Sequence, residues 1–162
     1  MFNRGYLTVS DLKEHRQYPS EARFKKGPVV ICECVERIPC NPCESACKFN
    51  AIKIGEDISN FPEVDFEKCS GCSLCVASCP GLAIFVLDKS YSDLNGKVTF
   101  PYEYPVQLTE GFVVDATDRS GKVVCKGTIT RIMKNKKLDG TAVISVEVPI
   151  QFVDEVRGIR ID

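Results

Sequence analysis

The chain has 162 residues, of which 44% are hydrophobic, enough for one or two small domains with at least one packed core. Its formal net charge of −1 excludes a general electrostatic attraction to nucleic acid or to anionic lipid. The longest aliphatic runs, VVIC and AIFVL, are too short to span a bilayer, and residues 1–15 contain no apolar run typical of a secretory signal. We therefore expect a soluble, cytoplasmic protein without membrane insertion.

Residues 1–30 are polar and charged, and we expect them to form an N-terminal extension. The stretch TVSDLKEHRQY, residues 8–18, predicts a short helix capped by Thr8 or Ser10, because a hydroxyl can accept hydrogen bonds from the first free backbone N–H groups of a helix. The segment has too few apolar residues for a core of its own. It should therefore lie over the next domain or over a partner.

Residues 31–90 contain most of the cysteines and an internal repeat. Nine of the ten cysteines lie between residues 32 and 79, and cytosolic thiols are kept reduced, so this clustering predicts a metal or cofactor site and not a disulfide framework. A shift of 32 residues places Cys40, Cys43, Cys47, Ala51 and Ile52 on Cys72, Cys75, Cys79, Ala83 and Ile84. The repeat predicts two related half-units, with short strands at 51–54, 63–66 and 83–87.

Residues 98–162 predict a small β domain. From Ala142 to 152 every second residue is apolar, which predicts a strand with one buried and one exposed face, and Pro149 indicates an edge position or a strand end. Two further strands should be joined at DRSG, 118–121, and KNKKLDG, 134–140, should be a polar turn. The expected fold class is α+β, with a ferredoxin-like dicluster domain followed by a small antiparallel β-barrel or sandwich.

An iron–sulfur motif lies in the second half-unit. It consists of Cys69, Cys72, Cys75 and Cys79 followed by Pro80, with the spacing C-x2-C-x2-C-x3-C-P. Three thiolates on one tight loop can reach three irons of a cluster, Gly71 lets the backbone wrap closely, and the fourth cysteine serves the other cluster when two are present. Structural zinc is the alternative, but zinc sites typically use two well-separated pairs of cysteines.

The first half-unit departs from this motif, because the residue that the repeat aligns with Cys69 is Arg37. A lost cluster, a three-iron cluster or a replacement ligand would each fit the gap. Cys34 is the preferred replacement, since the loop to Cys40 can bring it round at little entropic cost. Cys32 is the alternative ligand, although an ordinary buried packing role is also open to it. The prediction is two [4Fe–4S] clusters, cluster 1 held by Cys34, Cys40, Cys43 and Cys79 and cluster 2 by Cys69, Cys72, Cys75 and Cys47.

Lys48 stands where the motif has proline after the last cysteine. A cation favours the reduced, more negative state of a cluster, so we expect the cluster served by Cys47 to have the higher potential; a solvated lysine is the competing interpretation.

The single histidine, His15, excludes a Rieske site, and Cys125 is expected to be a core residue. Neither a dinucleotide-binding glycine motif nor a Walker loop occurs, so we expect no catalytic residue or nucleotide site in this chain.

From Cys34 to Ile84 the chain resembles the dicluster [4Fe–4S] ferredoxin family, over about a third of its length. The whole chain, with VICECVERIPCNPCESAC near its start and AVISVEVPIQFVDEVRGIR near its end, resembles small iron–sulfur proteins of anaerobic bacteria. Those proteins are associated with FAD-dependent amino-acid dehydrogenases of the proline, sarcosine or opine-oxidase kind. The resemblance implies a hetero-oligomer in which flavoprotein partner chains carry FAD and substrate, while this chain relays electrons.

Two other functions compete with an electron-transfer subunit. A free ferredoxin-like carrier is the first, but such carriers are compact and strongly acidic, whereas segments 1–30 and 98–162 exceed what a carrier needs and the net charge is −1. A scaffold or redox-sensing protein with structural clusters is the second. It would be supported by low-complexity linkers or by a basic face that binds nucleic acid, and the sequence has neither.

Overall fold

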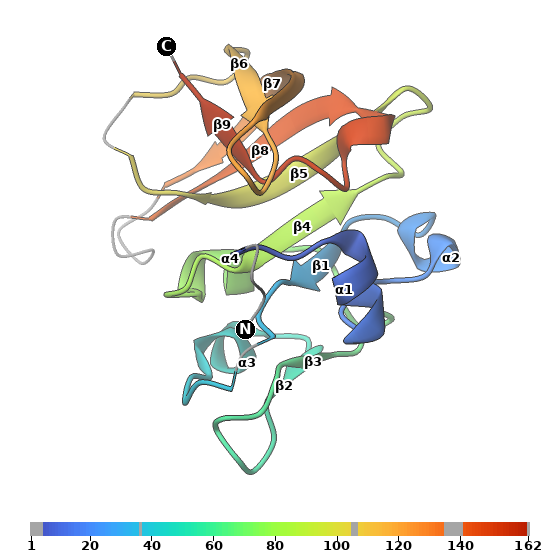
Figure 1. The fold of residues 1–162 in the computed structure, drawn as a ribbon, viewed down its shortest axis with the longest axis vertical. Helices are drawn as coiled ribbons and strands as arrows, with labels where there is room; N and C mark the ends of the chain where they lie inside the picture. Colours follow the sequence, from blue (N-terminus) through green and yellow to red (C-terminus); the bar gives the residue numbers. More distant parts are fainter. Residues whose placement is uncertain (1–4, 36, 105–106, 135–140, 162) are drawn as a thin grey trace.

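The computed structural model describes residues 5–35, 37–104, 107–134 and 141–161, with mostly strands and few helices (Figure 1). In chain order the elements are α1 (Val9–Glu14), α2 (Glu21–Phe24), β1 (Val29–Cys32), α3 (Pro42–Ala46), β2 (Ile52–Lys53), β3 (Glu63–Val64), α4 (Leu74–Ser78), β4 (Ile84–Asp88), β5 (Asn95–Tyr102), β6 (Val113–Thr117), β7 (Val123–Met133), β8 (Ala142–Pro149), the 3-10 turn η2 (Ile150–Phe152) and β9 (Gly158–Arg160). Figure 1 shows the cysteine-bearing part below the C-terminal strands, with α1 and α2 at its side. None of the described helices is long and apolar enough to cross a bilayer.

Seven of the described strands form one antiparallel sheet in the order β1-β4-β5-β8-β7-β6-β9. β2 and β3 pair separately, next to α3. β1 and β4 belong to the cysteine-bearing segment, and β4 pairs with β5 of the C-terminal segment, with Leu87 opposite Val98. The sheet therefore runs across the boundary expected between residues 90 and 98. The division into separate domains stays a prediction.

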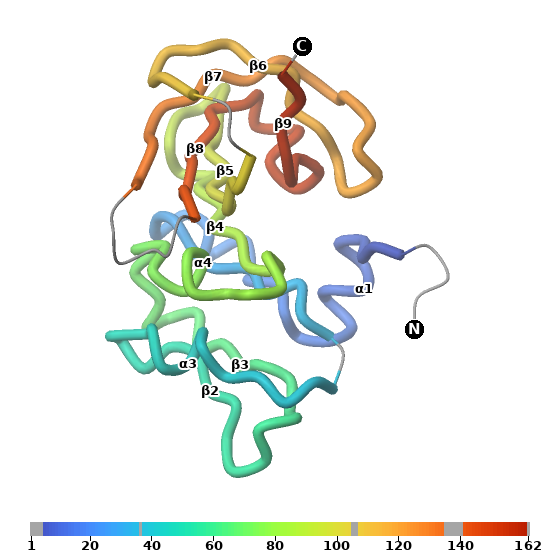
Figure 2. The backbone as a smooth tube through the Cα atoms, turned by 90° about the vertical axis from the view of Figure 1, so that its left-hand side faces the viewer, coloured from blue at the N-terminus to red at the C-terminus, as the bar shows by residue number. Residues whose placement is uncertain are grey.

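The main core lies inside the curve of this sheet, where β5 to β9 are arranged around a common interior (Figure 2). Its buried side chains include Val98, Phe100, Val114, Ala116, Ile129, Val146 and Val156. The N-terminal extension adds Leu7, Leu12 and Phe24 to the same core, so this segment lies over the rest of its own chain. The description of the C-terminal part as a barrel or a sandwich stays a prediction.

A second core joins the cysteine-bearing part to the sheet and corrects one expectation about β8. Its buried members include Val30, Cys32, Ile52, Val76, Ile84 and Val143. The expectation that Val143 and Ser145 lie on an exposed face is wrong, since both are buried. Val143 packs into this second core, and the hydroxyl of Ser145 lies 2.7 Å from that of Thr99 on the neighbouring strand. The first part of β8 is covered on both faces, because Ile144 and Val146 pack in the main core while Val143 packs in the second core.

Local signals predicted α1, the turn between β6 and β7 and the end of β8. α1 begins after Thr8, whose hydroxyl accepts the N–H of Asp11 at 3.3 Å while the Asp11 carboxylate accepts the N–H of Thr8 at 2.6 Å. The two strands expected around DRSG are β6 and β7, and the carboxylate of Asp118 accepts the N–H of Ser120 in the turn between them. β8 ends at Pro149, as expected. The expected polar turn at 134–140 lies outside the described residues from position 135 onward.

Candidate metal centres

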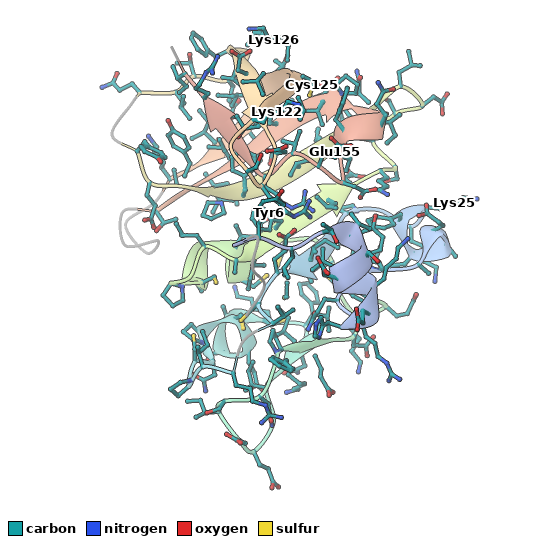
Figure 3. All side chains as sticks on the ribbon, in the orientation of Figure 1. Tyr6, Lys25, Lys122, Cys125, Lys126 and Glu155 are labelled. Carbon is teal, nitrogen blue, oxygen red and sulfur yellow. The ribbon has the colours of Figure 1, made fainter. Side chains whose placement is uncertain are left out.

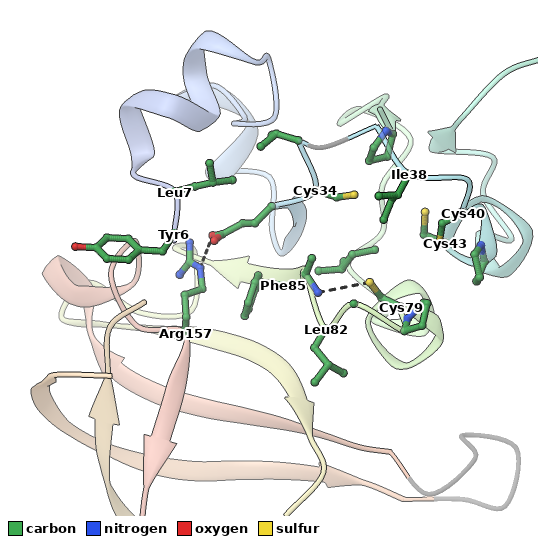
Figure 4. A pocket seen from close by; sticks show the side chains of 18 of the residues that line it. Tyr6, Leu7, Cys34, Ile38, Cys40, Cys43, Cys79, Leu82, Phe85 and Arg157 are labelled. Carbon is green, nitrogen blue, oxygen red and sulfur yellow. Dashed lines mark hydrogen bonds and ion pairs between the residues drawn. The ribbon is translucent and has the colours of Figure 1, made fainter. Parts of the chain in front are cut away.

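The predicted ligand cysteines lie in two groups of four, each lining its own cavity. Cys34, Cys40, Cys43 and Cys79 line the first cavity, where their side chains surround a shared space (Figure 4). Cys47, Cys69, Cys72 and Cys75 line the second cavity. The half-units thus exchange one cysteine each, because Cys47 follows α3 and Cys79 follows α4. These groups are the two expected ligand sets, and binding of iron by these individual thiols stays a prediction.

The two half-units repeat the same backbone turn at the predicted offset. Cys47 and Cys79 end α3 and α4 with similar backbone angles, φ −80° and ψ 96° for Cys47 and φ −83° and ψ 110° for Cys79. Three residues further on, Asn50 and Leu82 both have positive φ, 51° and 52°. Two non-glycine residues in this sparsely populated region at matching positions indicate that the same turn is required twice.

This turn directs a backbone N–H group at each exchanged cysteine. The N–H of Ala51 donates to the Sγ of Cys47 at 3.2 Å, and the N–H of Ala83 donates to the Sγ of Cys79 at 3.4 Å. Hydrogen bonds to cysteine sulfurs are one of the means by which proteins set the potential of an iron–sulfur cluster. The repeat therefore supplies equal local support to both thiol groups.

The first ligand position of the first half-unit is where the two halves differ. Arg37, which the repeat places there, is exposed, and its guanidinium carbon lies 5.7 Å from the ring centre of Phe61. Cys34 follows β1 closely and lines the first cavity. Cys32 is fully buried in β1 between the two thiol groups. Burial raises the pKa of its thiol, and Cys75 and Cys43, one from each group, raise it further.

The buried thiols show what a bound metal has to provide. Burial raises the pKa of Cys75 to about 12 and that of Cys43 to about 11. The charges of the other group members raise both pKa values further. Around Cys75 these are Cys69, Cys72 and Cys47. Around Cys43 they are Cys79, Cys34 and Cys40. Four thiolates repel one another, so metal binding here must release protons and supply positive charge. The donor set fits iron–sulfur clusters.

A single metal ion would need a different arrangement. In the ranges that the structure describes, no three His, Cys, Asp or Glu side chains converge tightly enough to hold one ion. A four-iron cluster is held by four cysteine thiolates, one to each iron, so its ligands need not converge on one point.

The N-terminal extension borders the second cavity. The N–H groups of Val30 and Gly71 both donate to the Sγ of Cys69 at 3.4 Å, and Arg23 donates to the carbonyl of Cys69 at 2.7 Å. Pro28 packs closely on Gly71, since a Cβ added to this glycine would lie 2.6 Å from the Cβ of Pro28. Sequence reasoning missed Arg23, Pro28 and Val30, because no motif or periodicity marks them.

The first cavity is larger, about 880 Å³, and its lining extends beyond the cysteines. Tyr6, Ile38 and Leu82 are among its exposed apolar lining residues. The remaining lining includes three charged residues that the sequence did not single out, Glu33, Arg119 and Arg157. The first cavity therefore opens onto an apolar rim and adjoins a charged network.

Glu33 binds both arginines of this network. Its carboxylate accepts two hydrogen bonds from Arg119, at 2.6 and 2.8 Å. It also accepts one from the Nε of Arg157 at 2.6 Å, which is the dashed line at Arg157 in Figure 4. Burial alone would raise the pKa of Glu33, but the hydrogen bond from Arg119 and the charges of Arg157 and Arg119 hold it below its usual value. Two guanidiniums and one carboxylate give this network a formal charge of +1.

The remaining cysteine has a packing role. Cys125 lies on β7 in the C-terminal part (Figure 3) and packs, partly buried, against the main core. This position agrees with the expected core role and is remote in the fold from both thiol groups.

The geometry of two thiol groups with exchanged cysteines is that of a two-cluster protein, and the comparison with protein families agrees. Residues 33–88 match the 4Fe-4S dicluster domain family. The match bears out the resemblance of this segment to dicluster ferredoxins and supports an iron–sulfur electron-transfer role. The protein therefore carries two [4Fe–4S] clusters, in agreement with the two four-thiol cavities.

Three curated relatives share this segment. One component of an ion-translocating oxidoreductase complex from Methanosarcina acetivorans is 44% identical over 59 residues, which cover 36% of this chain and 21% of the relative. One component of the Na(+)-translocating ferredoxin:NAD(+) oxidoreductase complex from Acetobacterium woodii is 53% identical over 38 residues, 24% of this chain and 11% of the relative. The ferredoxin-type protein NapF of Haemophilus influenzae is 38% identical over 66 residues, 40% of this chain and 38% of the relative.

These similarities are confined to parts of the proteins compared. The chain spans less than two-fifths of the length of each of these relatives. No solved structure matches the chain. The similarity therefore concerns the cluster-bearing segment.

Proposed function

We propose that this protein is the electron-transfer subunit of a cytoplasmic, hetero-oligomeric oxidoreductase and has no catalytic residue of its own. Cluster 1 would be held by Cys34, Cys40, Cys43 and Cys79, and cluster 2 by Cys69, Cys72, Cys75 and Cys47. Electrons would enter at one cluster, pass to the other and leave to a second redox partner.

The observation that supports this relay most directly is the exchange of cysteines between the half-units. Cys47 joins α3 to the second thiol group and Cys79 joins α4 to the first, so both groups share one small structural unit, with Cys32 buried between them. Such an arrangement favours electron transfer between the clusters. The two sides also differ, since Cys72 is exposed beside cluster 2 while cluster 1 adjoins the apolar rim. Two unlike faces suit two different redox partners.

For the partner we propose an FAD-dependent amino-acid or amine dehydrogenase of the proline, sarcosine or opine kind. The support is the resemblance of the whole chain to small iron–sulfur proteins associated with such enzymes. Two of the relatives are named as subunits of oxidoreductase complexes, which supports a multi-subunit setting in general. The dehydrogenase would oxidise its substrate at FAD and pass electrons singly to this chain.

Anaerobic purification from the native host with a tag on this chain tests the proposal. We expect a flavin-containing chain to co-purify at fixed stoichiometry, and we expect addition of its amino-acid substrate to reduce the clusters, seen by EPR. A tagged chain that purifies alone and accepts electrons from several unrelated reductases would instead support the free ferredoxin-like carrier. Clusters that no substrate or reductase can reduce would support a structural or sensing role.

A further inference from the structure

A buried arginine without a carboxylate partner lies beside the second thiol group. The guanidinium of Arg23 donates to four backbone carbonyls, those of Phe66 at 2.5 Å, Cys69 at 2.7 Å, Gly27 at 3.1 Å and Pro28 at 3.2 Å. Only 5% of the residue is exposed. In the described part of the chain, no Asp or Glu lies within ion-pair distance of Arg23. Its hydrogen bonds are satisfied, but its charge is not neutralised.

Such a charge is unusual because burying an unpaired ion is costly, and carbonyl dipoles compensate for only part of the lost hydration. The two arginines near the first thiol group, the buried Arg157 and the largely covered Arg119, share the carboxylate of Glu33. Arg23 has no such partner, and it holds the backbone carbonyl of Cys69, one of the ligands assigned above to cluster 2. A cluster with four thiolate ligands is an anion in both of its common redox states.

The contacts around Cys69 connect this charge to the cluster site. Arg23 holds the carbonyl of Cys69, while the N–H groups of Val30 and Gly71 bind its sulfur. Pro28, which also accepts a hydrogen bond from Arg23, packs directly on Gly71 in the same loop. The N-terminal segment thus provides one continuous set of contacts, from α2 to the first cysteine of the motif.

Other cations near this group are placed less favourably for acting on the cluster. Lys48 is exposed and is therefore screened by solvent and salt. Lys68 forms an exposed ion pair with Asp65 at 2.8 Å. Lys26 forms another with Glu67 at 2.6 Å. Among these cations Arg23 alone is both buried and unpaired, so its field acts on the cluster at the lowest dielectric screening.

We propose that Arg23 is the counter-charge of cluster 2, which positions Cys69 and raises the reduction potential of that cluster. The proposal rests on the ligand set given above for cluster 2. Reduction adds one electron and no proton to the cluster, so its negative charge grows by one, and a buried cation nearby favours that state. The same attraction helps to retain the cluster in the protein.

The test compares three variants of the full-length protein, each loaded anaerobically. Arg23→Gln removes the charge but keeps hydrogen-bond donors. Arg23→Lys keeps the charge but loses the planar array of donors of the guanidinium. Lys25→Gln, the control, removes an exposed charge from the end of the same helix (Figure 3). Each is also made in a Cys34→Ser background, where cluster 2 is expected to be the remaining cluster. The readouts are the midpoint potential from an EPR-monitored titration with mediators and dithionite, and the iron content.

In Arg23→Gln we expect the equilibrium constant for reduction of cluster 2 to fall about tenfold, which is about 59 mV for a one-electron couple. Arg23→Lys should stay close to the wild type, and Lys25→Gln should leave the potential unchanged. An unchanged potential in Arg23→Gln with full iron content would overturn the proposal. So would an equal shift in Arg23→Lys and Arg23→Gln, because the shift would then follow from loop geometry and not from charge.

If Arg23→Gln loses cluster 2 altogether, the Arg23→Lys variant decides between a charge effect and a structural effect. Retention of the cluster at the wild-type potential in Arg23→Lys would support the counter-charge role, whereas loss from both variants would assign Arg23 a purely structural role and overturn it. Failure of the relay itself would be visible separately, as wild-type clusters that substrate and partner cannot reduce. The potential of cluster 2 is measured with chemical mediators and does not depend on that partner.

Discussion

The two thiol groups are built on one repeated turn, but remote segments give them different surroundings. Both halves share the helix end, the left-handed residue and the N–H···S bond, at Cys47 to Ala51 and at Cys79 to Ala83. Around the second group the N-terminal segment supplies the buried cation Arg23. Beside the first group, the carboxylate of Glu33 binds two arginines of the C-terminal part, Arg119 and Arg157. A local repeat can thus duplicate a ligand loop, while packing against different segments makes the copies chemically distinct.

The largest effect should come from removing the displaced ligand of the first half-unit. We expect Cys34→Ser to reduce the iron content from about eight to about four atoms per chain, because one of two four-iron clusters loses a ligand. Cys32→Ala is the matched control, since this neighbouring cysteine packs in the second core and lines neither cavity. Iron and sulfide analysis of the anaerobically loaded protein measures both variants. Halved iron in Cys32→Ala with full iron in Cys34→Ser would mean that the ligand has been assigned to the wrong cysteine.

The next largest effect should come from the network beside cluster 1. Glu33→Gln removes the carboxylate that pairs with Arg119 and Arg157, and removal of one partner from a buried ion pair typically costs about 3–5 kcal/mol of unfolding free energy. The apparent thermal midpoint of the loaded protein, followed by circular dichroism under argon, should fall markedly. Glu56→Gln, at an exposed position, should leave it unchanged. Equal midpoints in the two variants would show that the network contributes nothing to stability.

A glycine exchange should separate the two ligand loops at intermediate magnitude. Gly71→Ala places a methyl group against Pro28 at a residue with φ +68°, so we expect a cost of about 2 kcal/mol and weaker retention of cluster 2. Gly81→Ala, next to Pro80 at the first cavity, meets nothing within 4 Å and should be tolerated. Comparing thermal midpoints and rates of iron loss to a chelator checks both. Similar behaviour of the two variants would contradict the close packing of the N-terminal segment on the second loop.

The smallest effect should come from the exposed lysine at the proline position. Lys48→Pro should lower the potential of cluster 2 slightly, and the shift should shrink in high salt because exposed charges are screened. The backbone should tolerate the change, since Cys47 has ψ 96° and Cys79, which precedes Pro80, has ψ 110°. Pro80→Lys is the reciprocal variant and should raise the potential of cluster 1. A redox titration at low and high salt measures both shifts, and an unchanged potential at low salt would assign Lys48 to the solvated surface.

The sequence predicted those features that short stretches of the chain determine by themselves. The cysteine spacing, the repeat offset, the Thr8 cap and the β6–β7 turn each depend on residues a few positions apart. Hydrogen-bonding geometry and the reach of a thiolate on a tight loop restrict such stretches strongly. The displacement of the first ligand to Cys34 stays a prediction, made because the repeat identified Arg37 as the exception.

Tertiary structure alone decided which distant residues surround each cluster. Arg23 contacts Cys69, which lies 46 residues further along the chain. Glu33 contacts Arg119 and Arg157, which lie 86 and 124 residues further along. Burial of Val143 and Ser145 on the second face of β8 likewise required a second core, which no periodicity within the strand could predict. The physical reason is that a charge beside a cluster acts through space and burial, so its partner depends on how the whole chain packs, whereas ligand spacing depends on the backbone between neighbouring cysteines.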